Sequence, residues 1–128
     1  MVVDTLGLIW GLSVTPASVQ DWDGAREVPL RARCAAPRMV RVYAAAAPAA
    51  APFWACWFAR VILFLVRKEP GQRGFVVQPR RWAVERTFGW FNRYRRLAKD
   101  HERTTESSAA FVYVAMIHLM VRRLAPET

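Results

Sequence analysis

The sequence is poor in the side chains that bind zinc or form disulfides. It has two cysteines and two histidines among 128 residues. Cys34 and Cys56 lie far apart, and neither His101 nor His118 stands at the spacing of a zinc ligand. We therefore expect no zinc site, and we expect both cysteines to be reduced and either structural or incidental.

Long hydrophobic runs are also missing. The strongest apolar run, Phe53 to Val66, has fourteen residues and contains Arg60, whereas a helix needs about 20 residues to cross a bilayer. We expect a core helix leading into a strand and no membrane partner, with an interfacial membrane segment as the alternative. No secretory signal is visible, because the first residues lack a basic region and Asp4 interrupts the apolar start. The expected location is the cytoplasm.

Acidic residues are scarce relative to basic ones. Ten Asp and Glu stand against nineteen Lys and Arg, which gives a formal net charge of +9. The excess is concentrated between Arg67 and Thr128, with thirteen basic and six acidic residues. Trp82, Trp90 and Tyr94 are interleaved with these cations, a composition that suits a phosphate backbone, although many solvated helices are basic for no such reason. The composition alone therefore leaves two interpretations open, a nucleic-acid partner and a solvated basic helix face, and DNA becomes the expected partner only with the family resemblance described below.

One acid, Glu85, stands among arginines in a predicted helix. At 100° per residue, four polar side chains fall within about 60° of one another: Arg81, Glu85, Asn92 and Arg96. The pair Arg81 and Glu85 has i,i+4 spacing, which often does no more than stabilise a solvated helix face by about 0.2 to 0.5 kcal/mol. Alternatively, Glu85 is one ligand of a divalent metal acting on phosphodiesters, with Arg81 and Arg96 holding phosphate oxygens. One acid alone cannot complete such a site.

The second half of the chain carries a longer pattern around this acid. The pattern begins with the run Gly74-Phe-Val-Val-Gln-Pro-Arg-Arg-Trp-Ala-Val-Glu-Arg-Thr-Phe-Gly-Trp-Phe91. It continues to Glu102 and then from Ser107 to Leu124. As a whole it resembles the C-terminal end of bacterial insertion-sequence DDE transposases of the insertion-sequence-five group. Those enzymes carry Tyr, two residues, Arg, three residues, Glu, six residues and Lys, and the Glu is their third catalytic acid. The resemblance places Arg81 and Glu85 at the Arg and Glu positions.

The sequence departs from that motif at two positions. Gln78 stands at the Tyr position and Asn92 at the Lys position, so Arg93, Arg95 or Arg96 would have to replace the lost cation. The resemblance and the basic surplus together predict a set of DNA-binding side chains: Arg80, Arg81, Arg86, Arg93, Arg95, Arg96 and Lys99. Of these, Arg86 and Arg93 point away from the Glu85 stripe on a helical wheel and would touch a separate strand.

The N-terminal part also resembles this family. The segments from Val2 to Trp10 and from Val14 to Ala25 are similar to the strand, turn, strand and helix entry between the first and second catalytic Asp, so the first Asp is expected upstream of this chain. Ala45 stands where the second Asp is expected, and Pro48 where a Tyr is expected. Of the three acids, Glu85 alone remains.

The resemblance implies Mg²⁺ or Mn²⁺ as the cofactor of the intact family. Two-metal phosphoryl transfer holds its ions about 3.5 to 4 Å apart with bridging carboxylates, so we expect this chain alone to bind no metal and to be catalytically incompetent. Three other acids are candidate substitutes. Asp4 is more simply the start of a turn, and Asp21 with Asp23 more simply opens a helix, where acids favour the dipole.

Predicted strands and helices follow a mixed α/β order within one domain. Strands are expected at 2–3, 8–14, 40–43 and 62–66, with 75–77 left open, and helices at 21–33, 80–99 and 107–124. The last helix is apolar nearly all round, so we expect it to be buried, with its cap supplied by Thr104 to Ser108.

The resemblance implies an incomplete ribonuclease-H-like fold, a sheet remnant with C-terminal helices. On this interpretation residues 1–128 are a partial DDE transposase catalytic domain in four parts: a strand and helix remnant at 1–43, an Ala/Pro-rich irregular segment at 44–52, an apolar helix and strand at 53–77, and C-terminal helices with the Glu motif at 78–128. Missing central strands would expose unpaired edges and favour a transposase oligomer or a homodimer.

Three functions of different classes fit these observations. The leading hypothesis is a truncated insertion-sequence transposase, ancestrally capable of DNA binding and metal-dependent DNA cleavage and strand transfer, which retains the Glu85 helix and nonspecific DNA contact. The second is a non-catalytic DNA-binding or interaction module that interferes with a full-length transposase. The third is a small membrane-surface protein built on Phe53 to Val66.

Overall fold

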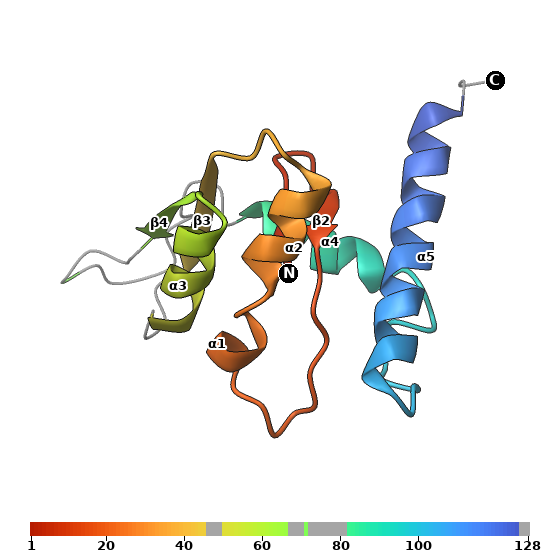
Figure 1. Ribbon diagram of the computed structural model, residues 1–128. Helices are drawn as coiled ribbons and strands as arrows, with labels where there is room; N and C mark the ends of the chain where they lie inside the picture. The colour runs from red at the N-terminus through yellow and green to blue at the C-terminus, as the bar shows by residue number, and fades with distance from the viewer. Residues whose placement is uncertain (46–49, 67–70, 72–81, 126–128) are drawn as a thin grey trace.

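The computed structural model describes residues 1–45, 50–66, 71 and 82–125 (Figure 1). These segments contain both strands and helices, intermixed along the chain, so the predicted mixed α/β class is confirmed. In chain order the elements are β1 (Val2–Val3), β2 (Ile9–Gly11), α1 (Asp21–Gly24), α2 (Val28–Ala35), β3 (Arg41–Ala45), α3 (Ala50–Phe58), β4 (Ile62–Val66), α4 (Trp82–Phe91) and α5 (Thr105–Leu124). The strand left open at 75–77 lies outside the described residues.

The described strands form two separate two-stranded sheets. β1 and β2 pair antiparallel, while β3 and β4 pair parallel with Arg41 opposite Ile62 and Ala45 opposite Val66. Parallel neighbours need a crossover connection, and α3 supplies it, so the predicted helix leading into a strand is confirmed. The helix is only partly a core element, because Trp54, Trp57 and Phe58 are exposed. The rings of Tyr43 and Phe64, which are partners in this register, stack with centroids 5.1 Å apart.

The turn between β1 and β2 is held by the carboxylate of Asp4. Its Oδ1 accepts hydrogen bonds from the backbone N–H groups of Leu6 at 2.8 Å and Leu8 at 2.9 Å, and its Oδ2 accepts one from Trp10 Nε1 at 3.2 Å. Gly7 completes the turn with a φ of 79°, a conformation that costs glycine little. Of the two interpretations of Asp4, the structure shows the turn.

Two predicted elements differ in the structure. The helix expected over 21–33 is split into α1 and α2, and Pro29 lies in the first turn of α2, where its missing N–H leaves no helical hydrogen bond unmade. The segment 44–52 is more regular than expected at its ends, because β3 extends to Ala45 and α3 begins at Ala50. Alanine suits the helix there, since it is the strongest helix former.

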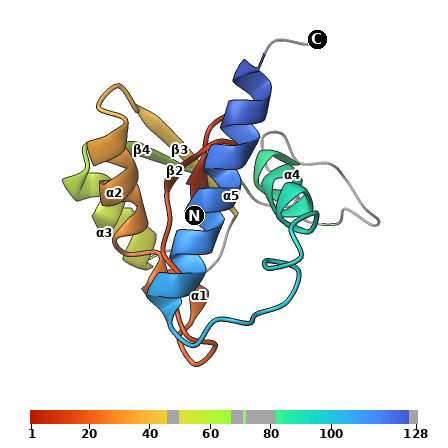
Figure 2. The same cartoon turned by 90° about the vertical axis from the view of Figure 1, so that its right-hand side faces the viewer.

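The helix α5 contributes one stripe to the core. Ala115 and Met116 of α5 pack with Phe91 of α4 in one buried cluster, to which Leu8 and Ile9 of the N-terminal hairpin are added. Figures 1 and 2 show α5 at one side of the molecule, and Figure 1 places β3, β4 and α3 at the opposite side. Its N-cap is as predicted, because Thr104 Oγ1 accepts a hydrogen bond from the N–H of Ser107.

The expectation that this last helix is buried was wrong. Apolar side chains on its outward side are exposed in the structure: Val114, Ile117, Val121 and Leu124. The reason is geometric, since the hairpin and α4 contact only one stripe of α5. By length and composition alone α5 could cross a membrane, but one such helix is weak evidence, because core helices of soluble proteins pass the same test.

Candidate functional site

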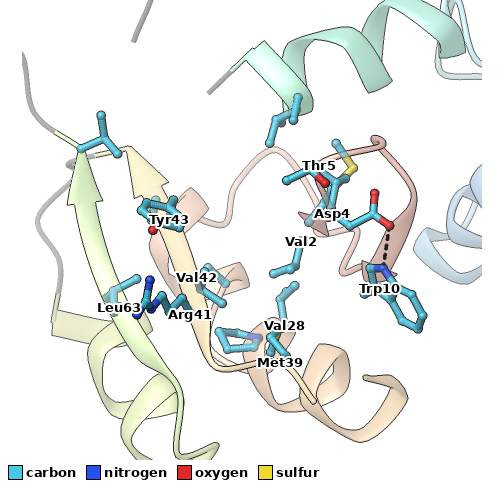
Figure 3. Close-up of a pocket in the computed structure, with 18 of the residues that line it drawn as sticks. Val2, Asp4, Thr5, Trp10, Val28, Met39, Arg41, Val42, Tyr43 and Leu63 are labelled. Atoms are coloured by element: carbon cyan, nitrogen blue, oxygen red, sulfur yellow. Dashed lines mark hydrogen bonds between the residues drawn. The ribbon is translucent and has the colours of Figure 1, made fainter. Parts of the chain in front are cut away.

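Glu85 lies in the first turn of α4, where a carboxylate interacts favourably with the helix dipole. Its side chain is exposed, and together with other residues of α4 it lines the cavity between the two sheets. Asp4 lines the same cavity from the β1–β2 turn, as Figure 3 shows. The structure therefore brings two carboxylates, those of Asp4 and Glu85, to one cavity. The sequence analysis did not predict this, because it grouped Glu85 with arginines of its own helix and placed Asp4 in a turn.

The polar stripe predicted along the Glu85 helix does not form. α4 ends at Phe91, so Asn92 and Arg96 lie beyond it and do not share a helix face with Glu85, while Arg80 and Arg81 lie outside the described residues. Backbone hydrogen bonds of i,i+3 type follow, from Tyr94 N to Phe91 O at 2.9 Å among others. The expected helix over 80–99 is correspondingly shorter.

Tyr94 explains why the chain leaves the helix there. Its hydroxyl donates a hydrogen bond to the carbonyl of Ala115 in α5 at 3.2 Å and lies 2.8 Å from Nδ1 of His118. If α4 continued through residue 94, the tyrosine side chain would have a different direction. The turn after Phe91 instead places the Tyr94 hydroxyl against α5. Packing between the two helices thus decides where α4 stops, and the helical periodicity of the sequence contains no such information.

Arg86, one of the predicted DNA-binding residues, makes contacts within the protein. Its Nη2 donates to the carbonyl of Thr5 at 2.9 Å, and its guanidinium lies 4.2 Å from the ring centroid of Trp82 and 5.0 Å from that of Trp90. Arg123 of α5 covers the same Trp90 ring at 4.6 Å and reaches the carbonyl of Leu6. These stacked contacts hold the hairpin turn against both helices. The DNA-binding role of Arg86 stays a prediction.

Arg96 is also engaged within the protein. Its Nε donates to the carboxylate of Glu102, and its guanidinium lies 5.0 Å from the ring centroid of Phe111. The second carboxylate oxygen of Glu102 accepts a hydrogen bond from Ser107 Oγ at 2.7 Å. The hydrogen bonds from Arg96 and Ser107 hold the pKa of Glu102 below its usual range. This network fixes the start of α5.

The segment 92–103, which connects α4 to α5 and which we call the basic segment, carries five basic and two acidic residues. Arg93, Arg95 and Lys99 are exposed, and none of these three side chains makes a hydrogen bond or ion pair with the rest of the described chain. Of the five predicted DNA-binding side chains that the structure describes, these three are thus the ones whose charge faces solvent without a partner within the described chain. Their role in DNA binding is untested by the structure.

The described donor atoms do not fit a divalent-metal site. Among residues 1–45, 50–66, 71 and 82–125, no group of three His, Cys, Asp or Glu could hold a metal ion. Asp4 already accepts three hydrogen bonds, which occupy most of the lone pairs of its carboxylate. Ala45, at the predicted position of the second Asp, ends β3 and has no side-chain donor atom, and Pro48 lies outside the described residues.

Two features of this region were missed by the sequence interpretation. Thr87 is fully buried, and its Oγ1 lies within hydrogen-bond distance of two carbonyl oxygens, that of Gly7 at 2.8 Å and that of Ala83 at 3.0 Å. A single threonine in an arginine-rich helix gives no signal of burial. The cavity itself was also missed, because it is formed by elements whose relative placement depends on tertiary packing.

Comparison with known proteins identifies the class of this chain. A family model described as "Transposase DDE domain" matches residues 56–122, from α3 to the last turns of α5. The match covers more than half of the chain and includes Glu85, so the chain belongs to the transposase DDE domain family. The predicted family is thereby confirmed. No curated protein and no solved structure matches the chain.

Proposed function

We propose that this chain binds duplex DNA without sequence preference through the basic segment and does not cleave or join DNA by itself. The observation that carries the proposal is the exposure of Arg93, Arg95 and Lys99 in a member of the transposase DDE domain family. Uncompensated cations release condensed counterions when they contact phosphates, which supplies salt-dependent affinity. This affinity carries no sequence information, because it arises from the backbone of the duplex alone.

Enzymes of this family generally use a divalent metal ion. The donor set argues against such an ion here, because Glu85 would need at least one further acid and Asp4 is committed to its turn. Two-metal phosphoryl transfer depends on carboxylates that bridge the ions. We therefore derive no catalytic step for the chain and propose DNA contact as its retained property.

Charge-removing variants test the DNA contact. Arg93, Arg95 and Lys99 are changed together to Gln, and binding to a duplex of about two helical turns is followed by fluorescence anisotropy. The control changes Arg26, Arg38 and Arg60, which are exposed and lie outside the basic segment. We expect the first variant to bind at least about tenfold more weakly and the control to bind within about twofold of wild type. Equal loss in both variants would reject the basic segment as the interface.

A cleavage assay tests the second half of the proposal. Supercoiled plasmid is incubated with wild-type protein and with Glu85→Gln in Mg²⁺ or Mn²⁺. We expect no nicking above a buffer control for either protein. Nicking by wild type that disappears in Glu85→Gln would show that the chain assembles a working site, and the proposal would then be wrong.

We propose that the two sheets belong to an incomplete ribonuclease-H-like fold of the insertion-sequence-five group. The parallel pair β3–β4 with its α3 crossover and the antiparallel hairpin β1–β2 support it. The substitution Ala45→Asp provides a check, since in such a fold this position would lie beside Glu85. The variant should acquire Mn²⁺ affinity, and adding Glu85→Gln to it should remove that affinity.

A second function is favoured by the exposed side of α5. Val114, Ile117 and Val121 form part of an apolar surface that an oligomer of an intact relative could cover. Co-expression with a full-length transposase of the family tests interference, and an unchanged transposition frequency would argue against it.

Flotation with anionic liposomes at low salt tests the membrane-surface alternative, which requires co-migration of the protein with lipid.

A further inference from the structure

The solvent side of α5 carries a stripe of small and apolar side chains that repeats every seven residues. Its positions follow one another at steps of three, four, three, four and three, the spacing of the core positions of a coiled coil: Ser107, Ala110, Val114, Ile117, Val121 and Leu124. The last four of these side chains are 59, 55, 58 and 84% exposed. Figure 1 places α5 at one edge of the molecule, and Figure 2 turns this edge toward the viewer.

The opposite side of α5 is already occupied by the fold. Ala115 and Met116 are buried in one cluster with Phe91, and at 100° per residue they point away from the exposed stripe. The helix thus has one apolar side for the core of its own chain and a second one whose spacing suits another helix. At 1.5 Å per residue, the stripe from 107 to 124 is about 26 Å long.

A second copy of the chain can supply a helix of matching length. The stripe spans eighteen residues of α5, whereas α4, the next longest of the described helices, has ten. The gaps between the described ranges contain at most ten consecutive residues, 72–81. A second copy carries α5 itself, and therefore a helix of the same length and the same spacing.

The order of side-chain sizes along the stripe fits a reversed copy. The steps of three and four read the same in both directions, so an antiparallel partner aligns at every layer. Each layer then combines a smaller side chain with a larger one: Ser107 with Leu124, Ala110 with Val121, and Val114 with Ile117. A parallel pair would set serine against serine and alanine against alanine, which leaves space at one end. Close packing favours the layers of similar total volume, and so the antiparallel pair.

The charges at the two ends of α5 favour the same direction. Glu106 lies in its first turn, and Arg122 and Arg123 lie in its last. An antiparallel pair brings the acidic start of each helix to the level of the basic end of the other, and it also opposes the two helix dipoles. A parallel pair would bring like charges together.

We propose that two copies of this chain associate through their α5 helices as an antiparallel pair, with a two-fold axis at the level between Ala115 and Met116. The same stripe is buried on both copies in such a symmetric interface, so every layer occurs twice. The interface is small because each copy contributes one helix, and the dimer is therefore reversible. This pairing names the occupant of the exposed side of α5 and does not depend on DNA contact by the basic segment.

Sedimentation equilibrium without DNA tests the pairing on the full chain. Ile117→Glu places a carboxylate in the interface twice per dimer, while Trp57→Glu places the same charge on the exposed side of α3. Wild type and Trp57→Glu should form concentration-dependent dimers. Ile117→Glu should raise the dissociation constant at least about tenfold, because an unpaired charge is costly to bury. Circular dichroism checks that both variants fold. A wild type that is monomeric at every concentration, or equal dimerisation of the two variants, would overturn the proposal.

Disulfide crosslinking tests the direction and the register. Ala110→Cys and Val121→Cys are made separately in a Cys34→Ser background, in which the remaining Cys56 is buried. An antiparallel pair puts position 110 opposite position 121, so a mixture of the two proteins should form a covalent dimer under mild oxidation. Either protein alone should crosslink at least about tenfold more slowly, because like positions lie eleven residues apart, roughly 16 Å along the axis. Rapid crosslinking of Ala110→Cys with itself, or none in the mixture, would overturn the antiparallel pair.

Discussion

The hydroxyl of Thr87 donates a hydrogen bond to the carbonyl of Gly7 over 2.8 Å, and it joins residues eighty positions apart in the chain. Thr87 has no exposed surface. The neighbouring carbonyls of Thr5 and Leu6 accept from Arg86 and Arg123. Three consecutive carbonyls of the hairpin turn are thus held by donors from α4 and α5. This clamp fixes the N-terminal hairpin on the two C-terminal helices.

Removing the Thr87 hydroxyl should destabilise the fold. Thr87→Val keeps the shape but leaves the buried Gly7 carbonyl without this donor, and an unsatisfied buried group costs about 1 to 3 kcal/mol. Thr87→Ser keeps the hydroxyl and loses one buried methyl, which costs about 0.8 kcal/mol. Urea unfolding followed by tryptophan fluorescence measures both. If Val were tolerated better than Ser, packing rather than the hydrogen bond would hold the hairpin.

Two glycines provide a matched test of the same contact. An added Cβ at Gly7, whose φ is 79°, would lie 2.8 Å from Thr87 Oγ1 and 2.8 Å from Trp90 Cζ3. Gly7→Ala should therefore lower the free energy of unfolding by about 2 kcal/mol or more. Nothing lies within 4 Å of a Cβ at Gly89 in α4, so Gly89→Ala should raise it by about 0.5 to 1 kcal/mol. Thermal melts of the pair should shift in opposite directions, and a shared direction would contradict the described turn.

The network around Glu102 should make stability depend on pH in the acid range. The pKa of Glu102 lies below its ordinary value because of the hydrogen bonds from Arg96 and Ser107. A carboxyl with a lowered folded-state pKa stabilises the fold fully above its unfolded pKa, about 4.3, and this contribution is lost as the pH falls through the folded value. Glu102→Gln should thus melt below wild type at neutral pH, with the gap closing once the pH has fallen below the folded-state pKa. A gap that stays constant would exclude the linkage.

The two cysteines should react at different rates. Cys34 is exposed, whereas Cys56 is buried in α3 and its pKa is raised by that burial. Since the thiolate is the nucleophile, a disulfide reagent at mildly alkaline pH should modify Cys34 within minutes and Cys56 only in denaturant. Cys34→Ser and Cys56→Ser assign the two phases. Fast modification of Cys56 in buffer would mean that α3 opens readily.

Local patterns in the sequence predicted much of the fold. The strand at 62–66 and the apolar helix before it followed from composition, and the capping threonine of α5 from its type and position. The end of α4 could not be predicted, because Tyr94 turns away to reach Ala115 of a helix that follows later in the chain. The burial of α5 was overestimated for a related reason, since hydrophobicity does not say how much covering surface exists.

The candidate site was predictable only in part. The resemblance around Glu85 gave the family correctly, and the basic surplus gave the region of positive charge. The sequence could not show which arginines make contacts inside the protein. Arg86 and Arg96 differ from Arg93 only through contacts with residues distant in the chain, such as Thr5 and Phe111.

The most direct test of the account is the salt dependence of duplex binding by wild type and by the variant with Gln at Arg93, Arg95 and Lys99. Each neutralised phosphate contributes about 0.9 to the slope of log affinity against log salt concentration. We expect the variant's slope to be shallower by about 2.7, and the control with Gln at Arg26, Arg38 and Arg60 to keep the wild-type slope. A slope that is the same in all three proteins would contradict the claim that the basic segment contacts DNA.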